Sequence, residues 1–164
     1  MAWAEVGAGN SEKPARSVSP VTKKYHYGPA QRFTNACYSW MTERGVGARY
    51  RYLLTVRSRT TGIERSIPVD VMTVAGFRWL VAGYGVVAWT RDVRVDGSVT
   101  LRRGKWSEHF TAVEVNDADA IPVLRTYMIT VPTTRAYFGT DAAAPSETLL
   151  AELREHPVFK LIRA

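Results

Sequence analysis

The stretch from Trp79 to Arg103 limits the folds open to this chain more than any other segment. A strand-like run ends there in a Gly-Tyr-Gly corner, and a short amphipathic helix, a turn and a second strand-like run follow. Most strand-like runs along the chain are separated by only two to eight residues. Parallel neighbours need crossovers of a dozen or more residues, so these short connections predict antiparallel pairing.

Hydrophobic periodicity places the other elements. Strands are expected at 50–57, 66–74, 77–82, 99–103 and 106–115. Helices are expected at 29–44, 86–95, 116–130 and 146–155, and residues 156–164 are expected to return as an extended tail. Closely spaced strands with helices before and after them predict an α+β fold, in which a mainly antiparallel sheet closes into a small barrel flanked by helices.

The length of 164 residues suits one domain with a substantial core. Residues 1–20 are rich in Gly, Ser, Ala and Pro and lack an apolar signal core, so we expect a flexible arm before a single domain at 21–164. No apolar run is long enough to span a membrane, and a cytoplasmic protein is expected. The single cysteine, Cys37, excludes an internal disulfide and is interpreted as a small core residue.

The net charge of +7 favours anionic partners. Arginines are frequent in the central half of the chain, and arginine suits bidentate recognition of phosphate or carboxylate groups. A solvated basic face is the alternative interpretation. A small basic barrel that binds nucleic acid is disfavoured, although Arg103 and Trp106 could serve such a role.

The Gly83-Tyr84-Gly85-Val86-Val87-Ala88 segment matches the dinucleotide fingerprint G-x-G-x-x-[G/A]. That fingerprint requires a parallel strand after the helix, and here a turn and a strand meander follow, so a nicotinamide site is disfavoured. The same glycines still allow the backbone to approach a ligand closely.

A polar corner between two expected strands is the candidate anion clamp. Arg59, Thr60, Thr61 and Arg65 offer guanidinium groups, hydroxyls and backbone amides, although a plain polar turn would look the same. Trp89 on the short helix is interpreted either as a core anchor or as a wall beside a ring system.

No arrangement of nucleophile and base is evident, so hydrolysis is not expected. The three histidines, His26, His109 and His156, lack metal-ligand spacing, and no metal site is expected. A redox enzyme remains compatible with this sequence, because a cofactor supplies most of its chemistry.

Several segments together resemble the deazaflavin-dependent nitroreductase family. They are Tyr52–Arg57, Thr61-Gly62, Arg65–Pro68, Trp79–Gly85, Trp89–Asp92, Val99–Gly104, Pro122–Arg125, Val131-Pro132, Tyr137-Phe138 and His156–Phe159. The resemblance covers the chain from about Pro29 onward. It implies a split β-barrel related to the flavin-binding pyridoxamine-phosphate-oxidase-like barrels, and it implies coenzyme F420, a deazaflavin with a phosphodiester and an oligoglutamate tail.

The resemblance also implies which residues contact the cofactor. The basic corner would hold the phosphate and tail, the segment after the third strand would lie along the ring, and the short helix would contribute further contacts. By position these are Arg59, Thr60, Thr61, Arg65, Ser66, Pro68, Ala82, Gly83, Tyr84, Gly85, Trp89, Arg91 and Asp92. Two departures stand out: Ser58 and Thr60 replace residues of the family corner, and Asp92 stands where Asn is common. A carboxylate beside an anionic cofactor would weaken its binding unless Arg91 or Arg94 compensates the charge, and whether Asp92 and Thr60 weaken binding is left open.

The leading hypothesis is therefore an F420-dependent oxidoreductase that transfers a hydride to a small or lipophilic acceptor such as a quinone, an enone or a nitro compound. Tyr127 and Phe138 are candidates to line the acceptor pocket, with Tyr137 as proton donor; aromatic core packing is the alternative for all three. FMN is the alternative cofactor, and a non-catalytic flavin- or tetrapyrrole-binding barrel is the alternative function. The acceptor, the oligomeric state and a peripheral membrane contact of the arm are left open.

Overall fold

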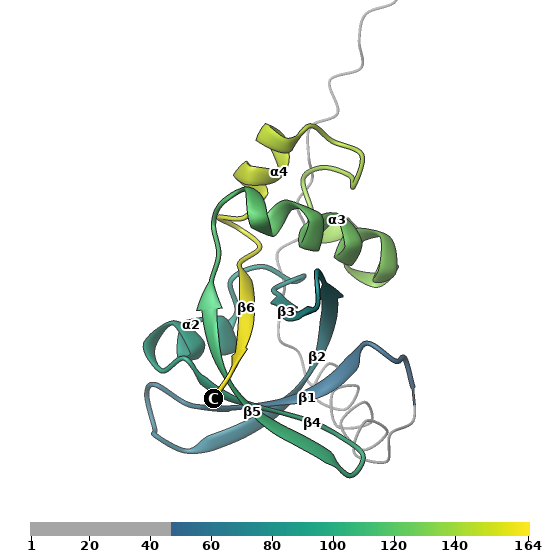
Figure 1. The fold of residues 1–164 in the computed structure, drawn as a ribbon. Helices are drawn as coiled ribbons and strands as arrows, with labels where there is room; N and C mark the ends of the chain where they lie inside the picture. Colours follow the sequence, from purple (N-terminus) through teal and green to yellow (C-terminus); the bar gives the residue numbers. More distant parts are fainter. Residues whose placement is uncertain (1–46) are drawn as a thin grey trace, which may run out of the picture.

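The computed structural model of the protein describes residues 47–164 (Figure 1). Three expectations fall outside the described residues: the flexible arm at 1–20, the first helix at 29–44 and the packing of Cys37. The fold and the site are therefore built from residue 47 onward.

Six strands form a closed barrel in which every pair of neighbours is antiparallel. The strands are β1 (Arg51–Arg57), β2 (Glu64–Val74), β3 (Phe77–Val81), β4 (Ser98–Arg103), β5 (Trp106–Glu114) and β6 (Val158–Arg163). Their order around the barrel is β1-β2-β3-β6-β5-β4. The predicted α+β fold, an antiparallel barrel with flanking helices, is confirmed for the described part of the chain.

Helices occupy two places around this barrel. They are α2 (Ala88–Val95), the 3₁₀ helix η1 (Ala118–Ala120), α3 (Ile121–Thr130), the 3₁₀ helix η2 (Pro132–Tyr137) and α4 (Ser146–Glu152). Figure 1 shows α3 and α4 together above the barrel and α2 beside β5 and β6. None of the described helices is long and apolar enough to cross a bilayer.

The tail expected at 156–164 contains the strand that closes the barrel. In β6, Phe159 lies opposite Leu80 of β3 on one side and opposite Glu114 of β5 on the other. The last strand of the sequence therefore joins the third strand to the fifth, and it contributes to the core with Phe159, which is 1% exposed.

Two apolar clusters divide the core. The first fills the barrel, because inward-facing residues alternate along each strand; it includes Leu54, Leu80, Leu101, Phe110 and Phe159. The second lies beneath the upper helices and includes Trp79, Leu124, Tyr127, Phe138 and Leu149. The strand β3 serves both clusters, since Leu80 faces one and Trp79 faces the other.

Several local features follow the expected chemistry, with shifted boundaries. Asp117 caps η1 by accepting a hydrogen bond from the amide of Asp119 over 2.9 Å, and the α-helix begins one turn later than expected. The 3₁₀ helix η2 follows α3 in a region where no element was expected, and α4 ends at Glu152 rather than at residue 155. Pro68 lies in the half of β2 that pairs only with β1, so its missing amide costs no ladder bond on the other side.

Candidate functional site

The centre of the predicted anion clamp is a buried carboxylate. Asp92 lies on α2 and is 1% exposed. Its Oδ1 accepts hydrogen bonds from the Arg59 guanidinium over 3.0 Å and from the Arg59 backbone amide over 3.2 Å. Its Oδ2 accepts from the Arg65 guanidinium. The turn between β1 and β2, the start of β2 and the helix α2 are thus held together by one side chain.

Two opposing effects set the charge of Asp92. Burial acts to raise the pKa of its carboxyl, but hydrogen bonds from Arg59 and the charge and hydrogen bond of Arg65 outweigh burial and hold the pKa below its ordinary value of 3.8. The carboxylate is therefore ionised at neutral pH and cancels one of the two arginine charges. The arginine side chains remain 34% and 40% exposed, so part of each guanidinium faces solvent.

The other corner residues are polar and exposed, as expected of a turn. The Ser58 and Thr60 hydroxyls lie 3.1 Å apart, and the Thr61 amide donates to the Ser58 hydroxyl over 3.4 Å. Ser66 lies across from Thr55, with 2.8 Å between the two hydroxyl oxygens. Pro68 faces Leu53 in the register of β1 and β2.

The arginines that compensate Asp92 are Arg59 and Arg65, and not its helix neighbours Arg91 and Arg94. Arg94 forms two hydrogen bonds of 2.7 Å with Glu114 of β5 instead, and Arg91 is exposed. The reason is the helical geometry: residues one or two positions apart on a helix point in different directions, whereas the β1–β2 turn folds back onto the face that carries Asp92.

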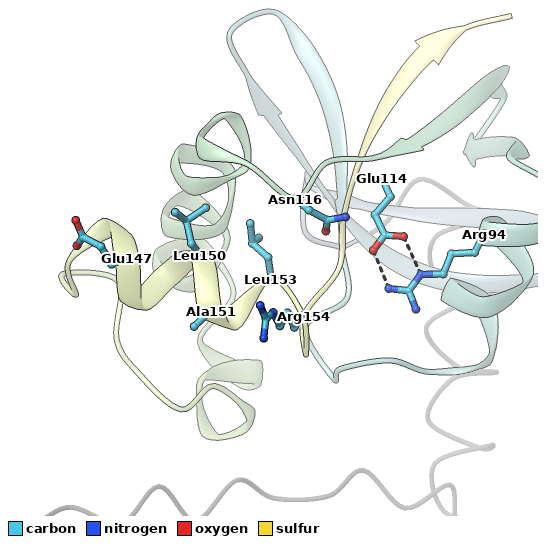
Figure 2. A pocket seen from close by; sticks show the side chains of 8 residues that line it. All are labelled: Arg94, Glu114, Asn116, Glu147, Leu150, Ala151, Leu153 and Arg154. Atoms are coloured by element: carbon cyan, nitrogen blue, oxygen red, sulfur yellow. Dashed lines mark hydrogen bonds and ion pairs between the residues drawn. The ribbon is translucent and has the colours of Figure 1, made fainter.

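The Arg94–Glu114 pair lies at the edge of a cleft of about 800 Å³ between the barrel and α4 (Figure 2). Leu150, Leu153 and Arg154 contribute to its other side. None of the site residues predicted from the sequence lines this cleft. The cleft is large, but it is therefore not the candidate site.

The Gly-Tyr-Gly corner after β3 requires glycine at both positions: Gly83 because of a tertiary contact and Gly85 because of its backbone conformation. A Cβ on Gly83 would lie 2.0 Å from the Tyr127 hydroxyl oxygen, so a side chain there would collide with the ring. Gly85 has a φ of +82°, in the left-handed region that favours glycine. Both neighbours of β3 are antiparallel to it, which argues against a dinucleotide-binding unit at this corner.

The three aromatic candidates gather near this corner. Tyr84 and Tyr137 are in edge-to-face contact at 5.0 Å between ring centroids, and Tyr127 and Phe138 lie 6.2 Å apart. Tyr127 is 2% exposed and Phe138 is 7% exposed, which is core packing. Burial and the nearby Asp70 charge raise the pKa of Tyr127 above its ordinary value, so its hydroxyl stays protonated. A role for these residues at an acceptor pocket stays a prediction.

His156 connects the corner to the aromatic group and was not predicted as a site residue. The ring is 2% exposed, with Nδ1 2.9 Å from the Ala82 carbonyl oxygen and Nε2 3.1 Å from the Tyr137 carbonyl oxygen. It stacks on Phe138 at 3.9 Å, and a Glu152 carboxylate oxygen lies 3.7 Å from Nε2. A neutral imidazole carries one N–H, so only the protonated ring can donate to both carbonyls at once.

The sequence did carry a signal for His156. The residue belongs to the His156–Phe159 segment that contributes to the family resemblance. Its spacing from the other histidines argues against a metal site and indicates no other role. Its partners are backbone carbonyls, which no side-chain motif reveals. Among the described residues, no group of three or more His, Cys, Asp or Glu side chains could hold a metal ion.

Trp89 is placed as the core-anchor interpretation predicts. Its ring lies 5.7 Å from that of Phe159 and packs against the apolar interior of the barrel. The helix α2 thus points Trp89 into the barrel and Asp92 toward the β1–β2 turn.

No protein-family model matches this chain, and no curated protein matches it. Solved structures do share its fold. An F420-H2-dependent reductase (FDR-A) is 20% identical, with 69% of this chain and 94% of that chain covered and a TM-score of 0.52. A structure described as a domain-swapped dimer is 21% identical, with 80% and 96% covered and a TM-score of 0.54. A protein of unknown function from Agrobacterium tumefaciens is 12% identical, with 88% and 57% covered and a TM-score of 0.51. At these identities the likeness shows the fold, which is the split-barrel type.

Proposed function

We propose that the protein is an F420-dependent oxidoreductase that transfers a hydride from the reduced deazaflavin to a small or lipophilic acceptor, such as a quinone, an enone or a nitro compound. One observation carries the proposal. The β1–β2 corner and α2, which the family resemblance assigns to the cofactor from separate parts of the sequence, meet through Asp92. The corner after β3 leads directly into α2, so the helix connects that corner to the cluster around Asp92.

The exposed charges at the β1–β2 corner suit an anionic cofactor. Arg59 and Arg65 are each bonded to Asp92 but keep about a third or more of their side chains exposed. Guanidinium groups held in this way can offer their remaining N–H donors to a phosphodiester or a carboxylate tail. Asp92 cancels one positive charge, so we expect this clamp to contribute orientation more than bulk electrostatic attraction.

The corner after β3 would contact the ring of the cofactor. Gly85 is half-buried and carries no side chain, and Tyr84 is 37% exposed beside Tyr137. The bound deazaflavin would supply the hydride. The residues of this chain would orient the ring and the acceptor relative to each other, and we propose Tyr137 as the group that donates a proton to the acceptor.

A fluorescence titration of the purified protein with coenzyme F420, and with FMN in parallel, tests the cofactor. We expect tight deazaflavin binding and weak flavin binding. Arg59→Gln and Arg65→Gln should each weaken F420 binding by roughly tenfold, the loss of one charge-assisted contact. Arg94→Gln is the matched control, because Arg94 pairs with Glu114 away from the corner. Binding of neither cofactor would overturn the proposal, and preference for FMN would move it to the flavin branch of the same fold.

A non-catalytic flavin- or tetrapyrrole-binding protein is the second candidate. The burial of Tyr127 and Phe138 favours it, because two residues proposed for an acceptor pocket are packed in the core. Protein that binds cofactor but reduces none of a broad panel of quinones, enones and nitro compounds would support this candidate. If turnover occurs and Tyr137→Phe leaves it unchanged, the enzyme assignment holds and the proton-donor role is wrong.

A further inference from the structure

The inner face of the barrel changes from apolar to aromatic and charged at the end where β4 turns into β5. Successive inward positions alternate with outward ones along a strand. Tyr52 therefore shares its face of β1 with the buried Leu54, and Arg103 shares its face of β4 with the buried Leu101. Trp106, at the start of β5, pairs directly with Arg103 and shares its face with Phe110. These side chains come from different strands and meet at one mouth of the barrel.

A cavity of about 360 Å³ opens at this mouth and is lined by Tyr52, Arg78, Arg103 and Trp106. The Tyr52 and Trp106 rings lie 5.7 Å apart at 75° to each other, so they form two walls of a corner. Mouths of β-barrels are frequent ligand sites, and this volume is within the range of small-molecule pockets.

Positive charge exceeds negative charge at this mouth. The Glu108 carboxylate is shared between Arg78, at 3.0 Å, and Arg163, at 2.6 Å. Arg103 donates to the Arg49 carbonyl oxygen over 3.2 Å, and within residues 47–164 it pairs with no carboxylate. Two guanidinium groups thus share one carboxylate and a third pairs with none among the described residues, and the surplus of positive charge favours an anion.

The aromatic rings orient two of these guanidinium groups. The Arg78 guanidinium carbon lies 4.4 Å from the Trp106 ring centroid, and that of Arg103 lies 5.9 Å from the Tyr52 centroid. A guanidinium that stacks on a ring keeps its N–H donors at its edge, where they can bind a planar carboxylate in a bidentate manner. The pocket therefore combines ring surface with a directed anion-binding edge.

We propose that this barrel mouth binds a small aromatic carboxylate, with the ring of the ligand against Trp106 and Tyr52 and its carboxylate on the Arg103 guanidinium. The site is separate from the clamp formed by Arg59, Arg65 and Asp92. Tyr52 lies near the start of β1 and Arg59 follows its end, so the pocket and the clamp are on the order of 20 Å apart along the strand. The inference does not depend on the cofactor.

Isothermal titration calorimetry of the full chain with benzoate, benzamide and acetate tests the proposal. Benzoate should bind at least tenfold more tightly than benzamide, which lacks the charge, and than acetate, which lacks the ring. This comparison uses the unaltered protein and is independent of the folding of any variant. Equal affinity for benzoate and benzamide, or no binding of benzoate, overturns the proposal.

Variants then locate the site. Arg103→Gln should weaken benzoate binding by roughly tenfold, and Trp106→Leu should remove the preference for benzoate over acetate. Arg94→Gln is the matched control and should bind benzoate as the unaltered protein does, since it lies in the cleft beside α4. Unchanged benzoate affinity in Arg103→Gln would overturn the assignment. Binding of oligothymidylate that displaces benzoate and weakens steeply with salt would instead indicate a nucleic-acid surface, and it too would overturn the proposal.

Discussion

The Arg59 guanidinium and backbone amide both donate to the same oxygen of Asp92, over 3.0 and 3.2 Å, across thirty-three positions of sequence. A buried carboxylate is stable only where such donors replace water. Asp92 therefore fixes the path of the β1–β2 turn and the side chains of Arg59 and Arg65 at the same time. It is a structural residue of the candidate site as well as a charge within it.

Replacing Asp92 with alanine should lower the free energy of unfolding by about 2–3 kcal/mol, because the Arg59 amide and two guanidinium groups lose a charged acceptor. Asp92→Asn should cost less, since its amide oxygen still accepts one or two of these bonds. Urea unfolding measures both. Asp119→Asn is the control, because Asp119 is exposed and its side chain has no ion pair in the described structure. A loss no larger than that of the control would contradict the role of Asp92.

The same carboxylate makes stability depend on pH in the acid range. The folded-state pKa of Asp92 is held below the ordinary value of 3.8, so the folded state favours the ionised form. The stabilisation from Asp92 is fully present above that ordinary value and is lost as the pH falls through the lower, folded-state pKa. The difference in urea midpoint between the unaltered protein and Asp92→Asn should therefore be constant near neutral pH and shrink below about pH 4. A difference that grows in acid would show that the sign is wrong.

Gly83→Ala should destabilise the protein by about 1–3 kcal/mol, because its new methyl group would collide with the Tyr127 ring. Removing the hydroxyl relieves only part of the collision, since two ring carbons would still lie 2.7 and 2.8 Å from the new Cβ. The double variant Gly83→Ala/Tyr127→Phe should therefore lose less stability than the sum of the two single variants. Thermal or urea unfolding of all four proteins forms the test, and strict additivity would mean that the two residues do not meet.

His156→Phe should cost about 2–4 kcal/mol, because the phenyl ring can keep the contact with Phe138 but offers no N–H to the Ala82 or the Tyr137 carbonyl. His156→Gln can supply one of the two bonds and should cost less. Hydrogen exchange should also rise in residues 82–85, which His156 joins to the end of η2. His109→Gln is the control, as the His109 side chain is exposed and its Nδ1 lies 2.8 Å from the Thr100 hydroxyl oxygen. Equal effects of His156→Phe and His109→Gln would contradict the connecting role.

Much of the local structure was predictable because its causes are local. Alternating apolar residues and tight turns located β1 to β5 to within a few residues, Asp117 marked the start of a helix, and Gly85 marked a corner that needs a positive φ. Short connections predicted antiparallel pairing, and the barrel followed from it. Boundaries such as the end of α4 shifted because the fraying of a helix depends on its neighbours.

The sequence alone thus determined the strand-and-helix order and the residue types that gather near the candidate site. Tertiary structure decided which of them meet. In the folded chain β6 lies between β3 and β5, and Asp92 pairs with Arg59 and Arg65 rather than with the arginines beside it in the sequence. His156 lies between two backbone carbonyls. Each of these contacts joins elements distant in the chain, and local periodicity carries no information about which surfaces a closed barrel brings together.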